Sequence, residues 1–384
     1  MSFRKRNSVL RAPRLANSAP EDKAIIAAGV RPSPHDGRLT TSTGTITLDQ
    51  ILAGHAGLPL GSSLLIQESG TTDFAGTLLR YFAAEGLVQG HHVHVLGAGD
   101  EWRRDLPGLA SHGKPSATQF TSSSPSPSPE KMRIAWRYGA LGNVPKPAKG
   151  AAVVPVTSDN GKPFCHDFDM AKRLESGDIA GQLLSHPPSS APSRSAPSAL
   201  GAFIADTALR LKESSPSSIH RIIVPSILSP TLYSPTACQP TEVIQFFHSL
   251  RGLLRQFPTQ VTALVTLPVS LYPRSTGLTR WMELLSDGVL ELIPFQHHSQ
   301  MGSGGALEGD KSQGLLRVHC LPVFHEKGGG LEGGSMREDM SFKLSASSGL
   351  VIVPFSLPPV GGDDGANNSS KPSEDAPPAH LLDF

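Results

Sequence analysis

The segment 43–85 constrains this chain most, because it has the order of a buried strand, a polar loop and a helix. The apolar run Leu64, Leu65 and Ile66 predicts the strand, and the polar, glycine-containing stretch 67–73 predicts the loop. The helix is indicated by apolar residues at helical spacing, at Leu78, Leu79, Phe82 and Ala83. In this arrangement the loop N–H groups and the helix N-terminus together can bind a phosphate group.

The loop lacks the chemistry of a working nucleotide site. Such loops end in Gly-Lys-Ser/Thr, because the lysine reaches the outer phosphates and the hydroxyl holds magnesium. Here no lysine occurs between Ser42 and Lys114, and we expect two carboxylates, Glu68 and Asp73, to lie where the phosphates would bind. Like charges about 4 Å apart cost roughly 1 kcal/mol in water and several times more near a protein surface. We therefore interpret the segment as a degenerate nucleotide loop, made of Glu68, Gly70, Thr71, Thr72, Asp73 and Phe74.

The second half of a RecA-type ATPase site is also missing. It needs an acidic residue at the end of the strand after the long connection, to hold the magnesium or polarise the attacking water. That strand, Ile222 to Val224, is followed by Pro225 and Ser226 and by no carboxylate. We therefore predict no catalytic residue and no intrinsic ATP hydrolysis.

Composition excludes several other classes of protein. The net charge of +1 argues against a globally basic nucleic-acid binder. The three cysteines form no Cys-x-x-Cys pattern and so predict neither a disulfide framework nor a zinc site, which fits a reducing compartment. His91, His92 and His94 lack an acidic or cysteine neighbour that would complete a metal site, and Cys165 to Asp167 lack a second cluster. We predict no metal and no cofactor.

No apolar stretch approaches the roughly 18 residues of a membrane span. The basic N-terminus carries no apolar segment, so we do not expect a secretory signal.

The order of the predicted elements indicates an α/β fold with a mainly parallel central sheet and a late antiparallel edge. We expect strands near 64–66, 93–96, 222–224, 261–267, 289–295, 315–324 and 350–355. We expect further helices at 200–211, 243–257 and 278–285, where apolar residues recur with the period of a helix.

We expect a basic, flexible N-terminal arm at 1–43, one domain at 44–357 and a disordered tail at 358–384. Low-complexity insertions rich in Ser, Pro or Gly are expected within the domain at about 111–130, 185–199, 300–314 and 326–338.

Several short segments, specific only in combination, together resemble the fungal form of the PAXNEB family, the family of Elongator complex subunit 4. The matching segments are 2–7 (SFRKRN), 29–34 (GVRPSP), 41–45 (TSTGT), 54–61 (GHAGLPLG), 70–76 (GTTDFAG), 134–138 (IAWRY), 164–169 (FCHDFD) and 221–226 (RIIVPS). They are scattered over most of the chain, with long unmatched stretches between them.

The resemblance implies a RecA-like domain without a functional P-loop. It implies a non-catalytic subunit that forms a hetero-hexameric ring with Elongator subunits 5 and 6. The implied ring binds tRNA and, with the catalytic Elongator subcomplex, supports 5-carboxymethyl-type modification of the wobble uridine. A location in the cytoplasm and nucleus, with no membrane partner, is implied as well.

In RecA-like rings the loops after the sheet strands face the central channel, and by this resemblance they are residues 229–240 and 269–279. The second loop and the helix after it carry Tyr272, Arg274 and Arg280. An aromatic ring with nearby cations suits base stacking and phosphate contact, so these residues are candidate RNA contacts. Arg4, Lys5, Arg6, Arg11 and Arg14 make the arm a second candidate for phosphate contact or nuclear import.

Two alternatives remain open from the sequence. The chain could be a ring ATPase subunit whose nucleotide site is completed in trans by partner subunits. It could also be an inactive structural scaffold.

Overall fold

The computed structural model describes residues 27–97, 99–110, 163–186, 198–295, 312–323, 340–346 and 349–355. The main-sheet strands are β4 (Ser63–Glu68), β5 (His92–Leu96), β8 (Gln182–His186), β9 (His220–Val224), β10 (Val261–Pro268), β11 (Gly288–Pro294), β12 (Gly314–Cys320), β13 (Met340–Ser345) and β14 (Gly349–Pro354). The helices are α1 (Ile46–Ile51), α2 (Phe74–Gln89), α3 (Ala199–Glu213), α4 (Pro240–Gln256), α5 (Gly277–Leu285) and the 3-10 helix η1 (Asp100–Asp105). Short outer strands are β1 (Val30–Pro32), β2 (Leu39–Thr41), β3 (Leu58–Pro59), β6 (Pro107–Leu109) and β7 (Phe168–Arg173).

The main sheet has nine strands in the order β14-β13-β12-β11-β4-β10-β9-β5-β8. All neighbours from β11 to β8 are parallel, whereas β12, β13 and β14 add antiparallel pairs at one edge. The chain therefore has an α/β fold with a large, mixed and mostly parallel sheet. The antiparallel edge follows the pattern expected from the sequence.

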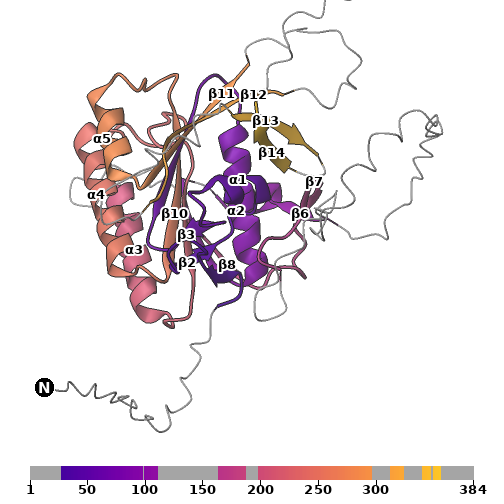
Figure 1. Cartoon of the computed structure of the whole chain (residues 1–384). Helices are drawn as coiled ribbons and strands as arrows, with labels where there is room; N and C mark the ends of the chain where they lie inside the picture. The colour runs from indigo at the N-terminus through magenta and orange to yellow at the C-terminus, as the bar shows by residue number, and fades with distance from the viewer. Residues whose placement is uncertain are drawn as a thin grey trace, which may run out of the picture.

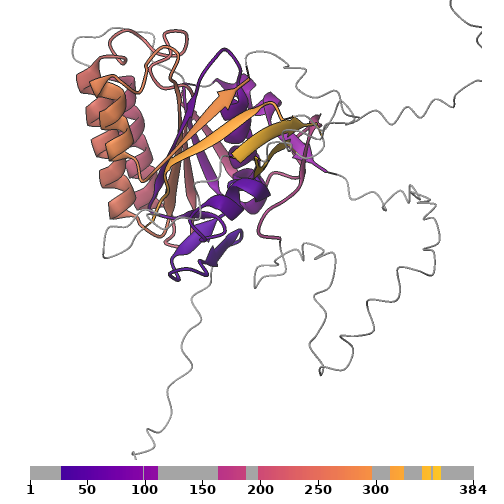
Figure 2. The same ribbon diagram turned by 45° about the horizontal axis from the view of Figure 1, so that its top comes forward.

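Helices cover both faces of the sheet (Figure 1). Helices α3, α4 and α5 lie on one face, and α1 and α2 lie on the other, as the turned view also shows (Figure 2). Alternation along β4 divides its side chains between the two layers: Leu64 and Ile66 pack in the cluster that contains α2, and Leu65 packs in the cluster of α3 to α5.

Helix α4 illustrates how the sequence produces these layers. Pro240 opens the helix, where its missing N–H costs nothing. The buried positions repeat with the helical period, at Val243, Phe246, Phe247, Leu250, Leu253 and Leu254. Among the helices within the described ranges, none is both long and apolar enough to cross a bilayer.

The N-terminal boundary differs from the expectation. Residues 30–41, expected in a flexible arm, form β1 and β2, which pair with β3 in a three-stranded sheet. Val30 is 2% exposed and Thr41 is fully buried, so this segment is part of the folded domain. The apolar content of 30–41 is low, and its order comes from hydrogen bonds to other segments, which composition does not reveal.

Two expected insertions are also shorter than the sequence indicated, because their end residues belong to strands. Residues 185 and 186, expected in an insertion, end β8, and Gly314 begins β12. The rest of the expected insertions (111–130, 187–197, 300–311 and 326–338), the tail 358–384 and residues 1–26 lie outside the described residues.

The connections between successive strands reverse their direction across the sheet at β4 and β10. From β4 the chain passes through α2 to β5 on one side, and from β10 it passes through α5 to β11 on the other side. Glu68 and Pro268, at the ends of the two strands, are register partners. In open α/β sheets ligands bind outside the carboxyl ends of the strands at such a reversal, so the loops that follow β4 and β10 form the candidate site.

Candidate functional site

The carboxylate of Glu68 occupies the place at the start of α2 where a phosphate would bind. It accepts hydrogen bonds from Thr72 Oγ1 at 2.7 Å, from the Phe74 N–H at 3.0 Å and from the Ala75 N–H at 2.8 Å. These are the loop and helix N-terminal donors that a phosphate-binding loop offers to its ligand. The protein therefore fills its own anion site with a side chain that is only 7% exposed.

Burial raises the pKa of Glu68 above its usual value, while the hydrogen bonds from Ala75, Thr72 and Phe74 oppose that rise. A second anion at this position would meet the carboxylate at contact distance and would find its donors already engaged. The loop geometry therefore disfavours phosphate binding on two grounds, which are occupied donors and like charge.

Asp73 does not share this space, contrary to the expectation that both carboxylates lie where the phosphates would. Its side chain is 64% exposed and pairs with Arg80 at 2.8 Å. An added Cβ at Gly76 would lie 2.0 Å from Asp73 Oδ1, so the glycine leaves room for this outward arrangement. The charge of Asp73 still contributes to the raised pKa of Glu68, but only Glu68 accepts hydrogen bonds from Thr72 and from the N–H groups at the start of α2.

The loop after β10 contacts the loop after β4. The Gly70 N–H donates to Ser270 Oγ at 2.6 Å, and Gln67 Nε2 donates to Glu283 Oε1 of α5 at 2.8 Å. The reversal of the sheet thus brings together residues about two hundred positions apart, as the strand order requires.

Arg274 and Arg280 converge on Glu283. Arg274 Nε lies 2.5 Å from Oε1 and its Nη2 lies 3.2 Å from Oε2, while Arg280 Nη1 lies 2.7 Å from Oε2. Burial opposes ionisation of Glu283, but the hydrogen bonds from Arg274, Gln67 and Arg280 outweigh it and lower its pKa. Glu283 was not singled out from the sequence, although its position three residues after Arg280 on a helix was an available signal.

The candidate RNA contacts differ in accessibility. The Tyr272 hydroxyl donates to the Leu228 carbonyl at 3.0 Å, and its ring packs against the core layer of α3 to α5. The Arg274 side chain is 30% exposed and the Arg280 side chain is 61% exposed. Of the two arginines, Arg280 is the more exposed to solvent.

The segment after β9 supplies no metal ligand. The Ser226 N–H donates to Thr266 Oγ1 at 2.6 Å, and the Tyr233 hydroxyl donates to the Pro225 carbonyl at 2.7 Å. No Asp or Glu occurs between Arg221 and Glu242. In the part of the chain that the structure describes, no three His, Cys, Asp or Glu side chains are grouped so that they could hold a metal ion.

Two of the histidines that raised the question of a metal, His92 and His94, stack on His220 instead. His94 Nε2 and His220 Nδ1 lie 3.0 Å apart, and the rings of His92 and His94 both stack on that of His220. His94 is fully buried and His220 is 1% exposed. This is a packed column of rings within the sheet layer.

A buried arginine holds the segment before α1 in place. Arg221 is fully buried and donates to Thr41 Oγ1 at 2.7 Å, to the Ser42 carbonyl at 2.8 Å and to the Phe82 carbonyl at 2.9 Å. It also donates to His91 Nδ1 at 3.0 Å. An arginine in an otherwise apolar strand was the sequence signal for this network, whose role is structural.

Comparison with known proteins adds independent information. Over residues 23–384 the chain matches the family described as PAXNEB protein. It is similar to Elongator complex protein 4 of Schizosaccharomyces pombe, with 30% identity over 374 residues that cover 94% of this chain and 96% of that protein. It is similar to Elongator complex protein 4 of Saccharomyces cerevisiae, with 27% identity over 348 residues (82% of this chain, 73% of that protein). A third relative is Elongator complex protein 4 of Xenopus laevis, with 30% identity over 375 residues (89% of this chain, 86% of that protein).

Proposed function

This chain belongs to the PAXNEB family, and we propose that it is a non-catalytic, RecA-like subunit of an Elongator complex that takes part in tRNA modification. In this role it forms a hetero-hexameric ring with Elongator subunits 5 and 6, and the ring binds tRNA and supports wobble-uridine modification by the catalytic subcomplex. The proposal includes a location in the cytoplasm and nucleus.

The observation that carries the non-catalytic part is the Glu68 carboxylate in the anion site. Three donors that would hold a phosphate donate instead to the carboxylate of Glu68. The place of the second acid is taken by Pro225 and Ser226. The site lacks the lysine and the acidic residue, and three of its donors are engaged by Glu68, so it has lost groups that phosphoryl transfer needs for binding and charge stabilisation.

The alternative of an ATPase completed in trans needs an arginine that can reach into a neighbouring subunit. Arg274 is held by two contacts to Glu283, which argues against it as that arginine. Arg280 has one such contact and greater exposure, and we propose it as an RNA contact together with Tyr272 and Arg274.

Complementation tests the proposed function. A fission yeast strain that lacks its own Elongator complex protein 4 would express this chain, and the 5-carboxymethyl-type wobble uridine content of its tRNA would be measured by mass spectrometry. We expect the modification to return, and to return equally with Glu175→Ala, an exposed control. A well-expressed chain that copurifies with the strain's subunits 5 and 6 but restores no modification would contradict the proposal.

A further inference from the structure

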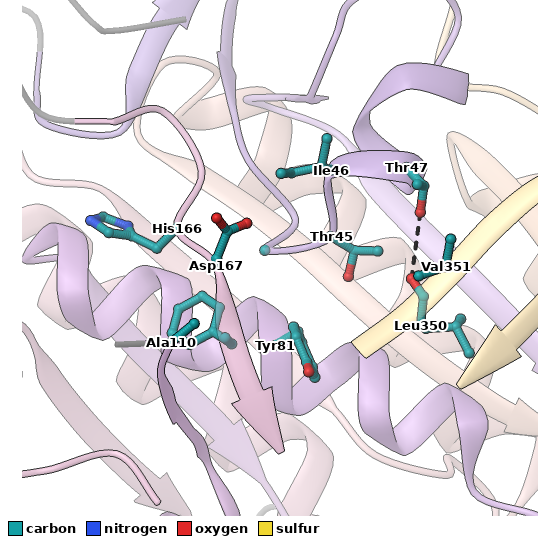
Figure 3. Close-up of a pocket in the computed structure, with 11 residues that line it drawn as sticks. Thr45, Ile46, Thr47, Tyr81, Ala110, His166, Asp167, Leu350 and Val351 are labelled. Atoms are coloured by element: carbon teal, nitrogen blue, oxygen red, sulfur yellow. Dashed lines mark hydrogen bonds between the residues drawn. The ribbon is translucent and has the colours of Figure 1, made fainter. Parts of the chain in front are cut away.

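A cavity of about 420 Å³ lies between α1, α2, β14 and the segment that leads into β7 (Figure 3). The accessible part of its wall includes apolar side chains. Helix α1 buries Leu48 and Ile51 but leaves its first residue, Ile46, 39% exposed at the cavity. Ala110 and Val351 are half-buried in the same wall. Covering these side chains would remove apolar surface from water, which favours an occupant with apolar groups.

Both ends of one segment of the chain meet at this cavity. Ala110, the last residue described before the segment 111–162, lines the cavity. The chain is described again from Pro163, and Asp167 lines the cavity as well. The Ala110 N–H donates to the Asp167 carbonyl at 2.9 Å, so the departing and returning stretches are joined at the rim. The segment 111–162 lies outside the described residues, and this double tether gives every part of it a high effective concentration at the cavity.

Within 111–162, the apolar and aromatic residues are most concentrated at 132–138 (MRIAWRY). Ile134, Trp136 and Tyr138 alternate there with a small residue and an arginine. In an extended chain such alternation directs the three large side chains to one side. The same stretch contains two arginines and no acidic residue.

The charge at the rim of the cavity is complementary to this stretch. Asp167 is exposed there, and no lysine or arginine is found among the described residues that line the cavity. The other titratable side chains of the lining are Tyr81 and His166, whose Nδ1 lies 3.1 Å from Glu85 Oε1. An acidic rim next to an apolar wall fits a basic segment that carries aromatic side chains.

We propose that residues 132–138 of this same chain dock in this cavity, with Trp136 against Ile46 and the arginines toward Asp167. A second copy of the chain would lose the freedom of a whole molecule on binding, whereas the tethered stretch needs only to close a loop. The inference goes beyond the proposed role in Elongator and does not depend on it, because the contact lies within one chain.

The test follows the fluorescence of Trp136 in the full-length chain. The chain has three tryptophans, so Trp102→Phe and Trp281→Phe together leave Trp136 as the single reporter. The free peptide 130–140 gives the value for an exposed tryptophan. We expect acrylamide to quench Trp136 about threefold to tenfold less in the chain than in the peptide, the ratio for a docked state populated about 70–90% of the time.

A matched pair of variants tests the position of the contact. Ile46→Lys removes the exposed apolar side chain at the cavity and adds a charge that repels the arginines, so the quenching of Trp136 should approach that of the peptide. Leu209→Lys makes the same kind of change at an exposed leucine of α3, on the opposite face of the sheet, and should have no effect. Cooperative thermal unfolding of both variants reports an intact fold. Quenching of Trp136 as strong as in the peptide, or an equal response to the two variants, would overturn the proposal.

A photo-crosslink tests the same contact without a change in the cavity wall. Benzoylphenylalanine at position 136 should crosslink within the chain to residues 44–47 or 349–351, which mass spectrometry identifies. Crosslinks to other parts of the chain would contradict the docking site. Crosslinks between two chains would assign the cavity to a second copy, and would overturn the proposal as well.

Discussion

Glu68 shows, at the scale of a single residue, how the loop before α2 supplies an acceptor for the first N–H groups of the helix. The helix start still needs a partner for its free N–H groups, since an unpaired buried donor costs about 1–3 kcal/mol. The Glu68 carboxylate meets that need, since it accepts from the Phe74 and Ala75 N–H groups.

Glu68→Ala should therefore uncover a latent anion site. We expect the variant to lose about 1–3 kcal/mol of unfolding free energy, because two backbone donors lose their acceptor. Phosphate at about ten times its dissociation constant should then restore about 1.4 kcal/mol, because it binds the folded state alone. Thermal unfolding in phosphate and in sodium chloride of equal ionic strength measures both effects.

The controls separate this site from general salt effects. Wild-type protein and Glu175→Ala, which removes an exposed carboxylate, should respond alike to phosphate and to chloride. An equal phosphate effect on wild type and Glu68→Ala would show that the carboxylate does not block an anion site.

The histidine column predicts a loss of stability in mild acid. Burial, followed by the charge of His92, lowers the pKa of His220 from 6.5 to about 4, and burial lowers those of His94 and His186 as well. The folded state thus resists protonation that the unfolded state accepts, so stability is full above about pH 6.5 and falls as the pH drops toward 4. For His220 alone the loss is about 3 kcal/mol.

Urea unfolding between pH 7.5 and 4.5 checks this, with His220→Gln as the comparison. The wild type should lose more stability over this range than His220→Gln does. Asp49 acts in the opposite sense, since burial raises its pKa to about 7 and its contribution is lost as the pH rises through that value. Asp49 is present in both proteins, so the difference between them reports the histidine column, in which the pKa of His94 also depends on His220. Parallel curves would refute the prediction.

At the scale of elements, the segment before α1 packs closely against α2, a contact that no sequence pattern indicates. Gly44 has φ +80°, and an added Cβ would lie 2.4 Å from the Tyr81 carbonyl oxygen of α2. Gly54, just after α1, has φ +75° but nothing within 4 Å. The two glycines share a backbone conformation and differ in their surroundings.

The pair supplies a matched test. Gly54→Ala should cost about 1–2 kcal/mol, the strain of a left-handed alanine. Gly44→Ala should cost about 1–3 kcal/mol more, because backbone of α2 must move to admit the methyl group. Equal losses in chemical unfolding would mean that the segment does not pack on α2 as described.

Helix α5, which follows the loop after β10, carries the most exposed of the proposed RNA contacts. Arg280→Ala should weaken tRNA binding by the assembled ring. One phosphate or stacking contact is worth about 1–3 kcal/mol, and contacts from the other subunits should keep the observed loss toward the lower end of that range. The loss should be similar across tRNA sequences and should shrink in high salt. Arg210→Ala is the control, because Arg210 is also an exposed arginine paired with a carboxylate on a helix but lies on α3. Fluorescence anisotropy with labelled tRNA measures both variants, and loss of the ring itself in Arg280→Ala would assign the residue to an interface.

The elements with strong periodic patterns were predictable from the sequence. Helix α4 and strands β4, β9, β10 and β11 lie where their apolar residues indicate. Strands β1 and β2 have only three residues each, and β7 and β8 carry several polar residues. Strands β7 and β8 pair with β6 and β5, which lie far from them in the sequence. Long-range pairing of that kind leaves no local period for a sequence pattern to report.

The candidate site likewise has features that the sequence predicts and features that only the folded structure determines. The missing lysine and the place of Glu68 follow from the order strand, loop, helix. The outward turn of Asp73 and the pairing of Arg274 with Glu283 depend on side-chain directions and on α5 meeting β4, which only the assembled sheet decides.

At the scale of the whole molecule, the mostly parallel sheet brings two loops together at one edge, and these loops bond to the protein itself. The reversal between β4 and β10 still brings two loops together, but their contacts join Gly70 to Ser270 and Gln67 to Glu283. The described surface also carries exposed apolar side chains at Leu271, in the loop after β10, and at Trp281 and Leu284 on α5. A fold that retains its edge loops without their chemistry is consistent with selection for assembly.

Calorimetric titration of Mg-ATP into the isolated full-length chain tests the central claim most directly. Because Glu68 fills the anion site and no lysine offsets its charge, we expect no binding tighter than about 1 mM, which corresponds to roughly −4 kcal/mol. Magnesium-dependent binding at about micromolar affinity, or roughly −8 kcal/mol, would contradict the account.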